Sequence, residues 1–219
     1  MSAAPASRSV KVPARGAQLA GDFTVPPGAG GIVVFAHGSG SSRLSPRNRS
    51  VAGVLHERGL ATLLFDLLTR EEDSVYETRF DIPLLTERLC DAVNWLGGLP
   101  EASNRKIGLF GASTGAAAAL QAAAALGGTV AAVVSRGGRP DLAGRKALQA
   151  VAAPTLLIVG EWDDVVIDLN KAAMEVMRCP YELKIIPGAT HLFEEPGTLE
   201  QAAAAAADWF ARYLTQMAR

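Results

Sequence analysis

Short apolar segments alternate with segments of helical periodicity along nearly the whole chain of 219 residues. The apolar segments are continuous and rich in branched side chains, which is typical of strands buried on both faces. Together with the helical segments, they predict one mostly parallel sheet that is covered by helices on both faces. The predicted strands are residues 31–38, 61–66, 105–111, 129–135, 154–160 and 181–187. The predicted helices are residues 47–58, 81–97, 114–126, 140–150, 166–178 and 198–217.

The remaining segments predict a single α/β domain over residues 1–219. Residues 8–25 alternate weakly between apolar and polar, which indicates an N-terminal two-stranded ribbon within residues 1–25. Residues 67–81 are expected to form a loop. The stretch between Ser135 and Pro154 is too short to hold a lid domain, so an open, shallow pocket is expected.

Composition narrows the classes of protein to which the chain can belong. A formal net charge of -1 argues against a broad nucleic-acid surface. No apolar run approaches the roughly 20 residues that cross a bilayer, and the N-terminus has no secretory apolar core. Cys90 and Cys179 show no metal-type spacing. We therefore expect a cytoplasmic protein with no membrane or nucleic-acid partner and no metal site.

Ser113 stands between two glycines where a predicted strand passes into a predicted helix, in the sequence Gly111-Ala112-Ser113-Thr114-Gly115. A Gly-x-Ser-x-Gly in this setting is typical of a sharp strand–helix turn that presents its serine above the sheet. A structural turn with an incidental serine is the alternative. The strand and helix around it favour a nucleophilic serine.

A nucleophilic serine needs a base, and the chain has three histidines: His37, His56 and His191. His56 lies late on a predicted surface helix, where it is expected to be solvated. The order nucleophile, acid, histidine leaves only His191, in the loop after the last predicted strand. His191 is therefore the predicted base.

The acid is expected between Ser113 and His191, at the end of a strand. Asp163 and Asp164 directly follow the predicted strand that ends near Gly160. A carboxylate there can orient the imidazole and stabilise the imidazolium. We favour Asp163, although the pattern leaves Asp164 open.

Two backbone amides are expected to stabilise the oxyanion. One is the N–H of Thr114, which follows the serine. The other is assigned to Ser39, in the glycine-containing loop after the predicted strand 31–38, because glycines let this backbone turn inward. His37 is expected to brace that loop.

Several arginines fall near the same edge of the predicted sheet. Arg43 and Arg136 are the predicted substrate-binding residues, since a guanidinium binds carboxylate or phosphate in two-point fashion. The same role in binding a substrate anion is considered for Arg47, Arg49 and Arg139. The alternative is that such residues tie loops down or face water. Asp66 is expected to bond backbone amides beneath the site.

These segments, in this order, resemble the α/β-hydrolase superfamily, and within it the small dienelactone-hydrolase-like proteins. The resemblance rests on VVFAHGSGSSRLSPRNR, LLFDLLTREE, GLFGASTG, LLIVGEWDDVV and IPGATHLFEEPG, and it extends from about residue 17 onward. It implies the α/β-hydrolase fold without a lid domain. The family's G-x-x-D segment corresponds to residues 160–163, which supports Asp163. One departure is that dienelactone hydrolase itself has a cysteine nucleophile where this chain has Ser113.

The predicted function is therefore a serine hydrolase that cleaves small carboxylic esters or lactones through Ser113, His191 and Asp163. Neither a metal nor an organic cofactor is expected. The partner is a small-molecule ester or lactone, and the oligomeric state stays open, a homodimer included. Acyl transfer or peptide cleavage by the same residues is an alternative, and so is a non-catalytic ligand-binding protein.

Overall fold

The structure, a computed structural model, describes residues 5–215. One eight-stranded sheet forms its centre, in the order β1-β2-β4-β3-β5-β6-β7-β8. β1 and β2 form an antiparallel ribbon that joins β4 antiparallel, and all the other pairs are parallel. The predicted mostly parallel sheet and N-terminal ribbon are thus confirmed. The strands are β1 (Ala6–Ala14), β2 (Ala17–Val25), β3 (Gly31–Ala36), β4 (Leu60–Phe65), β5 (Lys106–Ala112), β6 (Val130–Arg136), β7 (Thr155–Gly160) and β8 (Tyr181–Ile186).

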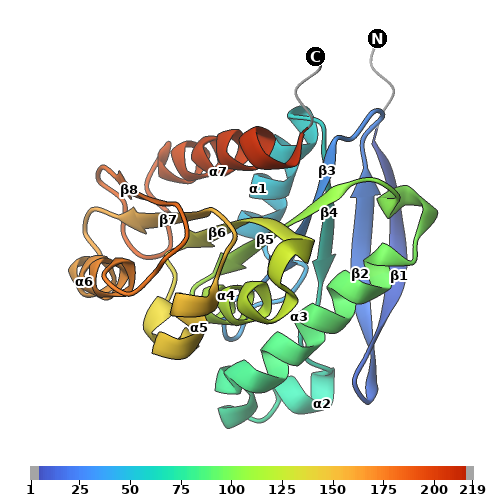
Figure 1. The fold of residues 1–219 in the computed structure, drawn as a ribbon, viewed down its shortest axis with the longest axis horizontal. Coiled ribbons are helices and arrows are strands. Elements are labelled where there is room, and N and C mark those ends of the chain that lie inside the picture. The colour runs from blue at the N-terminus through green and yellow to red at the C-terminus, as the bar shows by residue number, and fades with distance from the viewer. Residues whose placement is uncertain (1–4, 216–219) are drawn as a thin grey trace.

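Helices cover both faces of this sheet (Figure 1). α1 and α7 lie on one face, and α3, α4 and α5 lie on the other. No lid domain interrupts the connections among the described residues. The α-helices are α1 (Pro46–Glu57), α2 (Arg70–Asp73), α3 (Ile82–Gly97), α4 (Thr114–Leu126), α5 (Arg145–Ala150), α6 (Asp164–Met174) and α7 (Thr198–Leu214). The 3-10 helices are η1 (Glu77–Phe80), η2 (Pro100–Ala102), η3 (Gly127–Thr129) and η4 (Pro140–Ala143).

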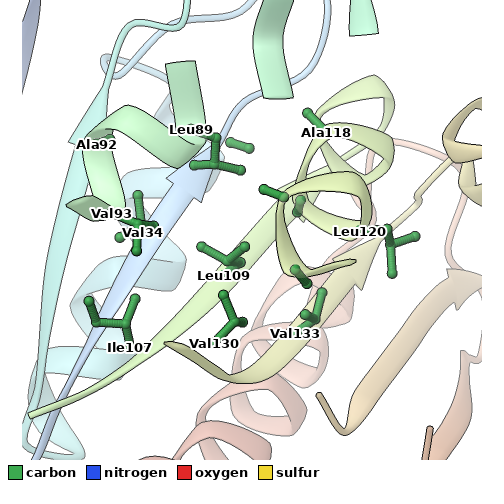
Figure 2. Close-up of a cluster of buried hydrophobic side chains, with 14 of the residues drawn as sticks. Val34, Leu89, Ala92, Val93, Ile107, Leu109, Ala118, Leu120, Val130 and Val133 are labelled. Atoms are coloured by element: carbon green, nitrogen blue, oxygen red, sulfur yellow. The ribbon is translucent and has the colours of Figure 1, made fainter. Parts of the chain in front are cut away.

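The two faces have separate hydrophobic cores. In Figure 2 the core on one face is formed by aliphatic side chains of β3, β5 and β6 against α3 and α4, among them Val34, Leu109 and Leu89. Alanines 116–119 of α4 are fully buried. Small side chains of high helix propensity let this helix lie close to the sheet on one side and close to the neighbouring helices on its other sides. The start of α4, which directly follows Ser113, is therefore firmly packed.

One segment differs from its predicted form. Residues 67–81 contain the short helices α2 and η1 rather than only loop. Thr69 begins α2 with a capping box: its Oγ1 accepts the Glu72 N–H, and the Glu72 carboxylate accepts the Thr69 N–H at 2.8 Å. A helix of four residues has no periodicity, so a capping motif is the only sequence signal that could have revealed it.

The ends of the prediction lie partly outside the described residues. Residues 1–4 of the predicted domain and residues 216–217 of the last predicted helix are among the undescribed positions. Within residues 5–215, no helix has both the length and the apolar character that crossing a membrane requires.

Candidate active site

Ser113 lies on a strained turn between β5 and α4. Its φ of 50° and ψ of -121° are outside the conformations that most side chains adopt. The flanking glycines are required by space: a Cβ atom at Gly111 would lie 2.4 Å from Cα of Ala116, and one at Gly115 would lie 2.2 Å from the carbonyl oxygen of Ala36. The predicted turn is confirmed, and it leaves Ser113 partly exposed while its neighbours are buried.

Asp163 and His191 form a close pair beside this turn. Asp163 follows β7 and makes no side-chain capping bond to α6. Its Oδ2 lies 2.6 Å from Nδ1 of His191. With a proton on Nδ1, the imidazole donates to the carboxylate and leaves Nε2 available as a base. Asp164 is the exposed first residue of α6, so the carboxylate beside the imidazole is that of Asp163.

The loop that carries His191 is held by contacts that the sequence analysis did not identify. The Glu195 carboxylate accepts the Thr190 N–H at 3.0 Å and the Thr190 hydroxyl at 2.7 Å. These hydrogen bonds lower the pKa of Glu195. On the other side, a Cβ atom at Gly137 would lie 3.5 Å from Cε1 of His191, so the imidazole lies directly against Gly137, the residue that follows β6. Glu195, four residues after the histidine, thus holds the start of the loop that carries His191.

Ser113 and His191 open onto the same small cavity of about 110 Å³. The remaining lining comes from the loop after β3, the start of α1, the ends of β5 and β6 and the loop after β8: Gly38, Ser39, Ser41, Ser45, Arg47, Asn48, Ala112, Arg136 and Leu192. A larger hollow of about 680 Å³ lies between the β1–β2 turn and α3, but its lining contains no serine and no histidine. The cavity beside Ser113 is therefore the candidate active site, despite its smaller size.

The two amides assigned to the oxyanion site lie close together. The Ser39 N–H donates to Oγ1 of Thr114 at 2.8 Å. Thr114 is the first residue of α4, where a helical N–H has no partner within the helix. The amide of Ser39 is therefore already hydrogen-bonded to Thr114, a contact that the sequence analysis did not anticipate.

His37 fastens the loop that carries Ser39. Its Nε2 accepts the Leu67 N–H at 3.0 Å, and its Nδ1 lies 3.0 Å from the Gly38 carbonyl oxygen. Burial lowers the pKa of His37, which favours the neutral ring that this pair of bonds requires. The expected bracing role of His37 is confirmed.

The arginines separate into two groups. Arg43 donates to the Asp66 carboxylate at 2.6 Å, and its backbone N–H donates to the same carboxylate at 2.8 Å. Arg43 is paired with Asp66 and is not among the described residues that line the cavity, so its role in substrate binding stays a prediction. The Asp66 carboxylate neutralises the Arg43 guanidinium and holds the loop that carries Arg43. It accepts a backbone N–H, as predicted.

Arg136 and Arg47 line the cavity, whereas the other two candidates do not. Arg139 forms a two-point pair with Asp141 at 2.9 and 2.7 Å, and Arg49 lies 3.4 Å from Asp22. Among residues 5–215 there is no group of three or more His, Cys, Asp or Glu side chains suited to a metal ion.

A mostly parallel sheet with a serine on the turn after β5 and an Asp–His pair beyond β7 defines the α/β-hydrolase fold. A sequence model of the dienelactone hydrolase family matches residues 23–219, and the chain belongs to this family of hydrolases.

One solved structure is similar to this chain in both sequence and fold, and a second is similar in fold. A dienelactone hydrolase from Anabaena variabilis is 55% identical with a TM-score of 0.93, over 96% of this chain and 99% of that one. Est1E from Butyrivibrio proteoclasticus is 17% identical with a TM-score of 0.79, over 93% of this chain and 98% of that one. The second likeness shows the fold alone.

A curated relative carries a different name. A protein of Mycobacterium tuberculosis named as a phosphoribosyl transferase is 58% identical over 205 residues, which are 94% of this chain and 46% of the relative. The chain thus spans about half the length of the curated relatives that it matches.

Proposed function

We propose that this protein is a serine hydrolase of small carboxylic esters or lactones, with Ser113 as nucleophile, His191 as base and Asp163 as the acid that orients it. The observation that carries the proposal is the 2.6 Å contact between Asp163 and His191 at a cavity that Ser113 also lines. The strained backbone of Ser113 supports it, because strain of this kind gathers at functional sites.

The proposed reaction uses these groups in two halves. Nε2 of His191 takes the hydroxyl proton as Oγ of Ser113 attacks the carbonyl carbon, and the amides of Ser39 and Thr114 receive the negative oxygen. The imidazolium then gives its proton to the departing alcohol oxygen, which leaves an acyl-serine. Water, deprotonated by His191, attacks the acyl carbon, and the proton returns to Oγ as the acid is released.

The size of the cavity supports a small substrate. About 110 Å³ has room for a short acyl group rather than a long aliphatic chain. The transferase name of the M. tuberculosis relative is not carried over, because that relative is about twice as long as this chain. Acyl transfer to an alcohol or peptide cleavage would pass through the same acyl-serine, and product analysis with competing alcohols and amines separates these outcomes.

The test pairs two neighbouring aspartates. Asp163→Asn is expected to lower kcat by about 10⁴-fold, because the imidazole loses the partner that fixes its tautomer. Asp164→Asn is the matched control and is expected to change kcat less than about twofold. Ser113→Ala is expected to lose 10⁴–10⁶-fold, roughly the range of a removed nucleophile.

Steady-state hydrolysis of short para-nitrophenyl esters measures all three variants, and circular dichroism checks their folding. Labelling of the unmodified protein with a fluorophosphonate, absent in Ser113→Ala, distinguishes a catalytic serine from a binding-only protein. A folded Ser113→Ala variant with normal turnover contradicts the proposal.

A further inference from the structure

Arg136, at the end of β6, is a buried cation in the wall of the candidate active site. The residue is 7% exposed. Its Nη2 donates to Oδ1 of Asn48 at 3.2 Å, while Nη1 is buried and has no hydrogen-bond partner among residues 5–215. The guanidinium lies 5.7 Å from the ring centre of Phe110 and 5.9 Å from that of Phe193. It is thus enclosed by aromatic rings and one neutral amide.

No carboxylate among residues 5–215 forms an ion pair or hydrogen bond with this guanidinium. Burial first, and then the nearby charge of Arg47, lower the pKa of Arg136 to about 10. The side chain therefore remains protonated at neutral pH. A buried cation without an acidic partner is costly, and the cost is met when a ligand brings the opposite charge.

The start of α1 adds positive potential at the same place. This helix of 12 residues begins after Ser45, and its first turn contains no acidic residue. The N-terminal end of a helix favours anions. Arg47 and Asn48 of this first turn line the cavity with Arg136. Arg47 also reaches across to Glu194 at 3.1 Å, beside the loop that carries His191.

We propose that Arg136, together with Arg47 and the N-terminus of α1, forms a subsite for an oxyanionic group, carboxylate or phosphate, on the substrate of the adjacent serine. This inference rests on the proposed function and deepens it: the protein selects esters or lactones that carry a negative charge close to the scissile carbonyl. The cavity of about 110 Å³ has room for such a compact group. A ligand oxyanion gives Arg136 the acidic partner that residues 5–215 do not supply.

The first experiment compares matched esters. The neutral substrate is para-nitrophenyl butanoate, and the charged ones are the mono-para-nitrophenyl ester of succinic acid and the para-nitrophenyl ester of phosphonopropanoic acid. The unmodified protein is expected to prefer one charged ester by about tenfold or more in kcat/KM, as a hydrogen bond to a charged group predicts. The better of the two charged esters identifies the oxyanion as carboxylate or phosphate.

The matched variants remove one positive charge each. Arg136→Met is expected to lower the ratio of charged to neutral kcat/KM by about 10- to 100-fold. Arg136→Lys, which keeps the charge without the planar fork, is expected to recover part of that ratio. Arg49→Met removes a cation from the same helix outside the cavity lining and is expected to leave the ratio unchanged. An unaltered ratio in folded Arg136→Met overturns the inference.

A second measurement does not depend on turnover. Calorimetric titration of Ser113→Ala with inorganic phosphate and with succinate is expected to show binding that Arg136→Met in the same background loses. If this binding occurs but no ester is hydrolysed, the subsite stands and the proposed function fails. If neutral esters are hydrolysed without a charge preference and neither anion binds, the proposed function stands and the subsite is overturned.

Discussion

Arg88 and Arg136 are two enclosed arginines in the same chain, with opposite surroundings. Arg88, on α3, is 2% exposed and donates to both carboxylate oxygens of Glu72, at 2.5 and 2.6 Å, and to the Leu67 carbonyl at 2.9 Å. Within the part of the chain that the structure describes, Arg136 has one amide oxygen as a partner and no carboxylate. The first cation is neutralised by the fold itself. The second lies at the candidate active-site cavity, where the proposed anionic substrate would supply the acid.

Glu72 links Arg88 to the local structure. Its carboxylate closes the capping box of α2 and binds Arg88, so one side chain holds this short helix to α3. The hydrogen bond from Arg88 is the largest cause that lowers the pKa of Glu72 to about 2. The charge of Arg88 is therefore neutralised by a carboxylate that also holds two helices together.

The largest expected effect in this comparison is on the stability of Arg88→Met. The change removes a buried partner of Glu72 and leaves the Leu67 carbonyl without its donor, which is expected to lower the free energy of unfolding by about 3–5 kcal/mol. Urea denaturation measures it. A loss below about 1 kcal/mol would show that the Arg88–Glu72 pair is no more structural than a surface ion pair.

The next effect is a pH dependence at the same pair. Because the pKa of Glu72 is lower in the folded protein than in the unfolded chain, its contribution is complete above about pH 4.5. That contribution is lost as the pH falls toward about 2. Unfolding measured across this interval is expected to show stability falling with acid, and Glu72→Gln is expected to flatten the fall. An identical slope in Glu72→Gln would remove this carboxylate as the cause.

The smallest effect is on the stability of Arg136→Met. Removing an uncompensated buried charge is expected to leave the free energy of unfolding unchanged or to raise it by about 1 kcal/mol, since the lost bond to Asn48 offsets part of the gain. The same urea experiment measures it. A loss of more than about 2 kcal/mol would mean that Arg136 serves the fold as Arg88 does.

The site was predictable where the chemistry requires a fixed order of residues. Ser113 could be identified because it lies between two glycines, where any side chain would clash with the neighbouring backbone. His191 could be identified from the order of nucleophile, acid and base along the chain. The sequence favoured Asp163, and the family's G-x-x-D pattern supported it, but Asp164 stayed open because neighbouring side chains after a strand point in directions that depend on where α6 begins.

The arginines show what sequence order cannot reveal. Arg43 and Arg136 had the same predicted role, yet Asp22 and Asp66 come near Arg43 only through the pairing of β2 with β4. His56 was expected to face water, but its Nε2 lies 2.8 Å from the Thr62 hydroxyl and burial lowers its pKa. Partners in both cases are supplied by packing between elements.

One predicted helix also differs from the structure, and the reason is local. The predicted helix over residues 140–150 is divided into η4 and α5 by Gly144, whose φ is 80°. A glycine inside a helical pattern can continue or end a helix, and the apolar spacing on its two sides does not say which. Neither η4 nor α5 contributes a residue to the cavity lining.

The hydrogen bond from Ser39 to Thr114 makes the proposed oxyanion stabilisation an exchange. In the resting protein the Ser39 amide already has a neutral hydroxyl as acceptor, so this dipole is kept aligned before any substrate arrives. When charge develops on the carbonyl oxygen, the amide trades that hydroxyl for a stronger, charged acceptor. The barrier is lowered only by the difference between the two bonds, and that difference arises in the transition state rather than in the bound ester.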